Sequence, residues 1–173
     1  MDAMMADLLA VADAAEADRF HLIGESIGGT ISLYAAINAP DRIRSVTALS
    51  TGHRGNYIQQ VGGWREMVEK DGFAVWTEKM MEHRFYPGAV DEDIYDWFAE
   101  TQADSSPETT LALGEMLMAQ DLSGELEKIN CPVLLIHPDS SPFLPVTISA
   151  EIHNLVPNSE MMVIPHAKHA IPV

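Results

Sequence analysis

The sequence is poor in cysteine, in basic residues and in long apolar runs, and each shortage narrows the class of protein. A single cysteine, Cys131, cannot form a disulfide within the chain, which favours a reducing, cytoplasmic setting. Only 10 Lys and Arg stand against 26 Asp and Glu, and the net charge of -16 disfavours nucleic acids and anionic membranes as partners. No apolar run reaches the roughly 18 residues of a membrane helix, and residues 1–20 lack the basic start of a signal peptide. We therefore expect a soluble, cytoplasmic protein.

Short apolar runs alternate with helical patterns along the chain, an order typical of a parallel sheet. Strands are predicted at residues 20–23, 43–49, 132–137 and 160–164, and helices at 1–17, 26–39, 121–130 and 147–155. Residues 53–120 show helical patterns only and contain all three tryptophans. The prediction is an α/β fold with a mostly parallel sheet of about four strands. Residues 1–52 and 121–173 form its core, and 53–120 form a helical cap.

A nucleophile motif lies between the first predicted strand and the helix that follows it. Residues 24–28 read Gly-Glu-Ser-Ile-Gly, which matches G-x-S-x-G in the strand-to-helix context that this pattern requires. On such a turn the Ser26 hydroxyl projects above the sheet edge, and the backbone N–H of Ile27 can stabilise an oxyanion. The other reading is a glycine turn that packs closely or holds phosphate, but neither G-x-G-x-x-G nor G-K-[ST] is present.

A serine nucleophile needs a base, and in this arrangement the base comes last in the chain, after an acid. His169 follows the last predicted strand in the run Pro-His-Ala-Lys-His-Ala at residues 165–170. His166 is the competitor, but it lies nearer the strand end, where a surface role suits it better. We therefore predict His169 as the general base.

Four stretches together resemble the α/β-hydrolase superfamily, and within it the 3-oxoadipate enol-lactonase and esterase branch. They are Gly-Glu-Ser-Ile-Gly-Gly at 24–29, Ala-Pro-Asp-Arg-Ile-Arg-Ser-Val at 39–46, the segment 72–85 from Gly-Phe-Ala-Val-Trp to Arg-Phe, and Ile-Asn-Cys-Pro-Val-Leu-Leu-Ile at 129–136. The resemblance covers nearly the whole chain. It implies a catalytic triad whose acid lies in the loop after the third predicted strand.

The acid loop departs from the pattern that the resemblance implies. The superfamily pattern resembles G-x-x-D-P-x-x-P, whereas residues 138–145 read Pro-Asp-Ser-Ser-Pro-Phe-Leu-Pro, so that Ser141 takes the expected aspartate position. Asp139, two residues earlier, is the candidate acid if the loop is remodelled. In the alternative, Asp139 only forms a turn and the protein is impaired or inactive. No Asp or Glu follows the strand that ends at Leu49.

The resemblance also implies that several strands and a helix precede the residues seen here. Their absence would remove the loop that usually supplies a second oxyanion N–H. It would also leave the strand at residues 20–23 as an exposed apolar edge. On this reading the chain is a fragment, or a second polypeptide completes it. We therefore expect the chain alone to aggregate or to show almost no turnover.

The predicted cap carries the aromatic and basic candidates for substrate binding. Trp64, Trp76, Phe85 and Trp97 are candidates to line an apolar acyl pocket, although helical spacing equally suits a small core of the cap itself. Three arginines of the cap could face a substrate carboxylate, and solvated surface is the alternative for each: Arg54, Arg65 and Arg84.

The leading functional hypothesis is a serine hydrolase that acts on a small-molecule carboxylic ester or lactone. It needs no cofactor and no metal. The same motif also serves carbon–carbon bond hydrolases, perhydrolases and acyltransferases, which fold and motif do not separate. A non-catalytic relative that binds a small apolar ligand or a protein is the alternative of a different class, and Ser141 favours it.

Overall fold

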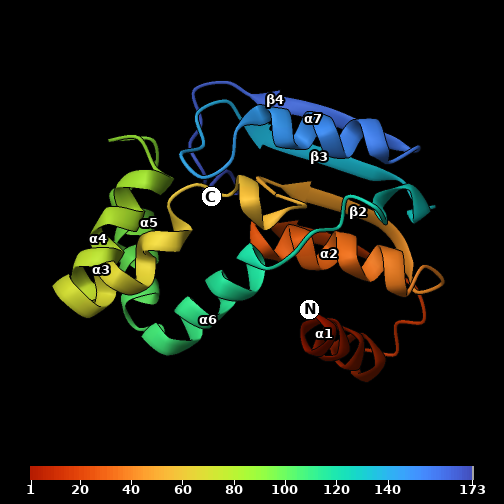
Figure 1. Ribbon diagram of the computed structural model, residues 1–173, viewed down its shortest axis with the longest axis horizontal. Coiled ribbons are helices and arrows are strands. Elements are labelled where there is room, and N and C mark those ends of the chain that lie inside the picture. Colours follow the sequence, from red (N-terminus) through yellow and green to blue (C-terminus); the bar gives the residue numbers. More distant parts are fainter. Residues whose placement is uncertain (173) are drawn as a thin grey trace.

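Four parallel strands form the sheet of this computed structural model, which describes residues 1–172. They are β1 (Phe20–Glu25), β2 (Ile43–Leu49), β3 (Val133–Pro138) and β4 (Ser159–Ile164), and they lie side by side in chain order (Figure 1). The predicted α/β class with a parallel sheet of about four strands is confirmed. Because the strands are parallel, their carboxyl ends meet at one edge of the sheet.

Two helices pack against the strands, α2 (Ile27–Asn38) and α7 (Val146–Leu155), and α1 (Asp2–Ala14) packs against α2. Figure 1 shows α2 and α7 on the same face of the sheet, with α1 beside α2. The side chains between helices and strands are almost all aliphatic, and their burial supplies the main hydrophobic stabilisation of this layer. The central ones are Leu33, Ala35, Ile43, Val46, Leu126, Ile129, Leu135 and Ile152.

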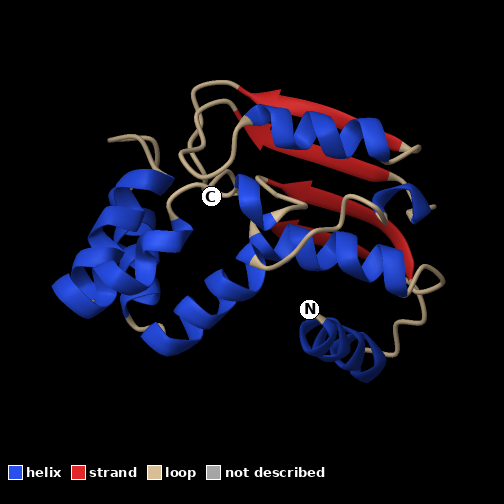
Figure 2. Ribbon diagram, viewed as in Figure 1, coloured by secondary structure: helices blue, strands red, loops and turns tan. Residues whose placement is uncertain are grey.

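Four further helices connect β2 to β3 and lie beyond the carboxyl ends of the strands (Figure 2). They are α3 (Trp64–Asp71), α4 (Phe73–Arg84), α5 (Glu92–Ala103) and α6 (Pro107–Met118). The Ser106 hydroxyl accepts a hydrogen bond from Thr109 N and Pro107 occupies the first turn, which explains why α6 begins there. A second hydrophobic cluster joins this segment to the loop after β3 through Trp76, Met80, Phe143 and Leu144.

The predicted helix at residues 121–130 is wrong. Only a short 3-10 turn forms there, at Leu126–Lys128. The Asp121 carboxylate accepts hydrogen bonds from both the backbone N–H and the hydroxyl of Ser123, so it closes a local turn and caps no helix. Leu122 and Leu126 are buried in the sheet core, and this packing holds the segment in place without regular structure.

The β1 strand has a paired neighbour on one side only within residues 1–172. Ile23 in this strand is 77% exposed, as expected for an apolar edge. In the same described range, no helix combines the length and the apolar character needed to cross a bilayer.

Candidate active site

Ser26 occupies a strained turn between β1 and α2. Its backbone has φ 53° and ψ -119°, a conformation that non-glycine residues rarely adopt. The Ser26 N–H donates to Leu49 O on the neighbouring strand at 2.9 Å, and its carbonyl accepts from Gly29 N and Thr30 N at 3.1 and 3.2 Å. These bonds compensate for the strain and hold Ser26 at the carboxyl edge of the sheet.

Two glycines allow this turn to be so tight, and one of them lies outside the five-residue motif. A Cβ on Gly24 would lie 2.3 Å from Gly28 O, and one on Gly29 would lie 1.7 Å from Thr51 Oγ1. A Cβ on Gly28 would meet nothing within 4 Å. The crowded positions are therefore Gly24 and Gly29, and the second glycine of the motif, Gly28, is not crowded.

Ile27 begins α2, where the first N–H groups of a helix have no partner within the helix. No hydrogen bond from the Ile27 N–H appears in the described part of the chain. This donor lies next to Ser26 and at the positive end of a helix dipole, a position that favours negative charge.

His169 lies in the segment after β4, and its side chain is almost completely buried, at 4% exposure. Its Nδ1 atom lies 2.9 Å from Ser50 Oγ and 3.3 Å from Ser141 Oγ. The ring also packs edge to face on Phe143, with centroids 4.8 Å apart. Two serine hydroxyls therefore occupy the side of the imidazole where a triad carboxylate would lie.

These two hydroxyls come from the ends of two neighbouring strands. Ser50 directly follows β2 and is fully buried, with φ 49° and its N–H bonded to Ile136 O. Ser141 lies in the loop after β3, where its oxygen accepts from Phe143 N and Leu144 N at 3.3 Å each. A hydroxyl can donate to Nδ1 as well as accept from it. Unlike a carboxylate, it does not select the Nδ1–H tautomer that a general base needs.

The surroundings of His169 favour its neutral form strongly. Burial, followed by the positive charge of Arg84, lowers the pKa of the imidazole from 6.5 to about 3. His169 is therefore unprotonated at neutral pH, as a base must be. Within residues 1–172 no carboxylate forms a hydrogen bond with His169, so the protonated ring lacks the partner that a catalytic triad supplies.

Asp139 does not reach His169, contrary to its predicted role as the acid. The Asp139 side chain is exposed, and its carboxylate accepts hydrogen bonds from Ser140 Oγ and His166 N at 2.8 and 3.1 Å. These bonds, with that of the Ser140 hydroxyl first, lower the pKa of Asp139. Its backbone N–H donates to Ile164 O. Asp139 thus connects the loop after β3 to the segment after β4, because its carboxylate accepts a hydrogen bond from the His166 N–H.

Ser26 and His169 line one small cavity of about 50 Å³. No hydrogen bond joins their side chains in the described structure, although the two residues line the same cavity. A second cavity of about 280 Å³ also opens on Ser26, next to Ile27. Trp64 lines both cavities and Trp76 lines the larger one, so two of the predicted substrate-binding aromatics lie beside Ser26.

The other two predicted aromatics lie elsewhere. Phe85 packs edge to face on Phe98 in a separate cluster with Met81 and Ala170. Trp97 lies on the outer side of α5 and is 60% exposed. Neither lines a cavity with Ser26. The alternative of a core within the cap, which helical spacing supports, holds for Phe85, whereas Trp97 lies at the surface.

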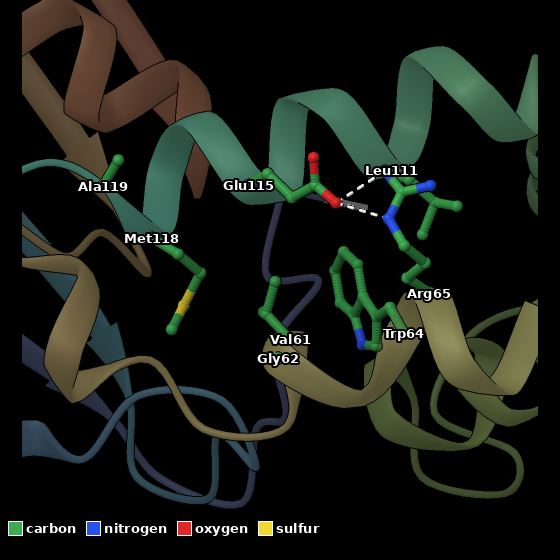
Figure 3. A pocket seen from close by; sticks show the side chains of 8 residues that line it. All are labelled: Val61, Gly62, Trp64, Arg65, Leu111, Glu115, Met118 and Ala119. Atoms are coloured by element: carbon green, nitrogen blue, oxygen red, sulfur yellow. Dashed lines mark hydrogen bonds and ion pairs between the residues drawn. The ribbon is translucent and has the colours of Figure 1, made fainter.

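Figure 3 shows a different pocket, which Trp64 and Val61 also line and whose volume is about 360 Å³. Arg65 at the start of α3 forms an ion pair with Glu115 of α6 across this pocket. Both side chains are largely exposed, so the pair contributes little to stability. Neither Ser26 nor His169 lines this pocket, which is therefore separate from the Ser26 cavities.

Arg84, by contrast, lies beside Ser26. It ends α4 and lines both cavities that Ser26 lines. Its positive charge acts on Glu25, the residue before Ser26, although the two form no direct ion pair. Burial raises the pKa of Glu25 to about 7, and Arg84 moderates that rise.

Sequence reasoning missed Ser50 and Glu25, and it named Arg84 only as one of three cap arginines. Ser50 could have been found, because it directly follows a strand predicted next to that of Ser26, and parallel strand ends share one edge. Arg84 could not be separated from Arg54 and Arg65, because helical spacing does not say which turn of a cap helix faces the sheet. No group of three or more His, Cys, Asp or Glu side chains within the described range could hold a metal ion.

A strained serine on a strand-to-helix turn, with a buried histidine after the last strand of a parallel α/β sheet, defines the class of site found in serine hydrolases. The family comparison agrees with this class. The chain belongs to the alpha/beta hydrolase fold family, whose model matches residues 1–173.

Individual relatives are distant, and the chain spans about 65% of the length of the curated relatives that it matches. A RutD protein of Shigella flexneri, whose name proposes carbamate hydrolysis, is 25% identical over 96% of this chain and 65% of its own length. The enol-lactonase of Burkholderia xenovorans LB400 superposes with a TM-score of 0.89 at 18% identity, covering 99% of this chain and 66% of its own. A thermophilic esterase from Thermogutta terrifontis superposes with a TM-score of 0.82 at 20% identity, and the match covers 98% of this chain and 65% of the esterase. These two structural matches establish the fold.

Proposed function

We propose that this protein is a serine hydrolase of small carboxylic esters or lactones, with Ser26 as nucleophile and His169 as general base. The observation that carries the proposal is the strained conformation of Ser26 at the start of α2, in a cavity that His169 also lines. Similarity to an esterase and to an enol-lactonase supports the choice of ester bonds.

The reaction proceeds through an acyl-enzyme. Ser26 Oγ attacks the carbonyl carbon while its proton passes to His169 Nε2, the ring nitrogen that faces neither Ser50 nor Ser141. The Ile27 N–H stabilises the oxyanion. The intermediate then expels the alcohol, which takes the proton back from His169. Water, deprotonated by His169, releases the acid and restores Ser26.

A fluorophosphonate probe tests the proposal, because it reacts covalently with an activated serine. We expect the parent protein to be labelled, and both Ser26→Ala and His169→Ala to abolish labelling. His166→Ala is the matched control and should be labelled like the parent, since its exposed side chain lies outside the Ser26 cavity. Labelling that persists in Ser26→Ala would disprove the nucleophile assignment.

A non-catalytic binding protein is the second candidate, and the two hydroxyls at His169 Nδ1 favour it. A folded parent protein that takes no label would support this candidate. Carbon–carbon bond hydrolases, perhydrolases and acyltransferases use the same nucleophile. A panel of p-nitrophenyl esters, enol-lactones and vinylogous diketones separates them from ester hydrolysis.

A further inference from the structure

His137 lies at the carboxyl end of β3, the strand whose following loop carries Ser141. Its side chain is fully buried, and both of its ring nitrogens have hydrogen-bond partners. Nε2 lies 3.1 Å from Leu144 O near the end of that loop, and Nδ1 lies 2.7 Å from Ser149 Oγ in α7. One side chain therefore connects the end of the strand, the end of the loop and the helix that follows.

The chemistry of these two partners fixes the tautomer of the His137 ring. A carbonyl oxygen only accepts hydrogen bonds, so Nε2 carries the hydrogen and donates it to Leu144 O. Nδ1 then has a free lone pair, which accepts the hydroxyl hydrogen of Ser149. Burial lowers the pKa of His137, and the hydrogen bond to Leu144 O opposes that change. The ring is therefore neutral at pH 7 and is held as its Nε2–H tautomer.

The loop after β3 is poor in backbone donors of its own. Residues 138–145 contain three prolines, which have no N–H: Pro138, Pro142 and Pro145. Leu144 is only 3% exposed, so water does not readily replace a donor that its carbonyl loses. Within residues 1–172, the hydrogen bond to this carbonyl comes from His137. His137 thus supplies from its side chain a donor that fixes the end of the loop.

The same loop supplies two of the groups that contact His169. Ser141 Oγ lies 3.3 Å from His169 Nδ1, and Phe143 packs edge to face on the ring. The N–H of Leu144 also donates to Ser141 Oγ, at 3.3 Å. A series of hydrogen bonds therefore runs from α7 to the His169 ring through, in order, Ser149, His137, Leu144 and Ser141.

We infer that His137 is a positioning residue for His169, because it fixes the end of the loop after β3 and, through Leu144, holds residue 141 against Nδ1. His137 lines neither of the cavities beside Ser26, so it acts on His169 only through the loop. The role of His169 as a base rests on the proposed function, whereas the placement of residue 141 by His137 does not. A histidine that only filled the core would not control that placement through its hydrogen bonds.

Nitrogen-15 NMR of the imidazole rings first tests the inference in the parent protein. We expect His137 to be the neutral Nε2–H tautomer at pH 7, because Leu144 O can only accept a hydrogen bond. A ring found as the Nδ1–H tautomer could not donate to Leu144 O and would overturn the inference.

Substitutions of His137 then test its effect on His169 in a Ser141→Asp background, where the titration of His169 reports how close residue 141 lies. Ser141→Asp alone should raise the titration midpoint of His169 by at least about two pH units, because a nearby carboxylate stabilises the imidazolium. Adding His137→Leu removes both hydrogen bonds and should reduce this rise to less than about one pH unit. Adding His137→Gln should preserve the rise to within about half a pH unit, because an amide both donates and accepts.

A milder variant and a matched control complete the test. Ser149→Ala removes only the hydroxyl donor to Nδ1 and should lower the rise by about half. His153→Leu should leave it unchanged, because exposed His153 of α7 pairs with Ser159, which begins β4 at the opposite edge of the sheet from His169.

Circular dichroism identifies the folded variants. An undiminished rise in folded His137→Leu or in Ser149→Ala would overturn the inference, as would loss of the rise in folded His137→Gln. None of these measurements uses turnover, and fluorophosphonate labelling tests Ser26 separately, so the inference and the proposed function fail independently.

Discussion

The nucleophile side and the base side of the site differ in how they are built. On the nucleophile side, backbone hydrogen bonds and two crowded glycines, Gly24 and Gly29, hold Ser26. On the base side, side chains hold His169, and its Nδ1 atom lies next to two serine hydroxyls at the position where a catalytic triad has a carboxylate. Because several backbone hydrogen bonds hold Ser26, no single side chain determines its conformation. A single substitution at residue 141, in contrast, changes the hydrogen-bond partner of His169.

The largest expected effect comes from supplying the missing carboxylate. Ser141→Asp places an anion next to His169 Nδ1, which selects the Nδ1–H tautomer and stabilises the imidazolium. We expect hydrolysis of p-nitrophenyl acetate to rise by roughly 10² to 10⁴ times, since a wrong tautomer costs on the order of 10⁴ in a serine protease.

Asp139→Asn is the matched control for this gain and should change the rate by less than about twofold, because its exposed carboxylate contacts Ser140 and His166. If Asp139→Asn abolished activity and Ser141→Asp left it unchanged, Asp139 and not residue 141 would act on His169, which contradicts the contacts seen here. A gain in Ser141→Asp that is lost again in Ser141→Asp with Ser26→Ala would tie the effect to the nucleophile.

The next effect is on the nucleophile side and concerns stability. In Gly24→Ala the new methyl group meets the Gly28 carbonyl, a backbone atom that cannot move aside, so unfolding should become easier by about 3 kcal/mol. Gly28→Ala is the matched partner. Its methyl group meets nothing, and alanine favours the helix by up to about 1 kcal/mol, so stability should stay level or rise. Urea denaturation followed by circular dichroism measures both, and equal losses would contradict this picture of the turn.

The difference between the two sides also shows what sequence could predict. Strand 43–49 was found with its observed bounds, and the serine turn was found from its residues, because both depend on local pattern. The segment 121–130 was predicted wrongly as a helix, because buried Leu122 and Leu126 have helical spacing. Its backbone conformation is instead determined by packing and by a local turn at Asp121. The partners of His169 come from residues 50 and 141, and only the folded sheet brings these distant parts together.

Titration of the His169 imidazole by nitrogen-15 NMR tests the absence of a carboxylate partner most directly. With its pKa lowered to about 3 by burial and by Arg84, the ring should stay neutral from pH 8 down to pH 5, and Ser141→Asp should move its titration upward into that range. A parent His169 that gains a proton between pH 6 and 7 would show that an anion already stabilises it, and would contradict the account.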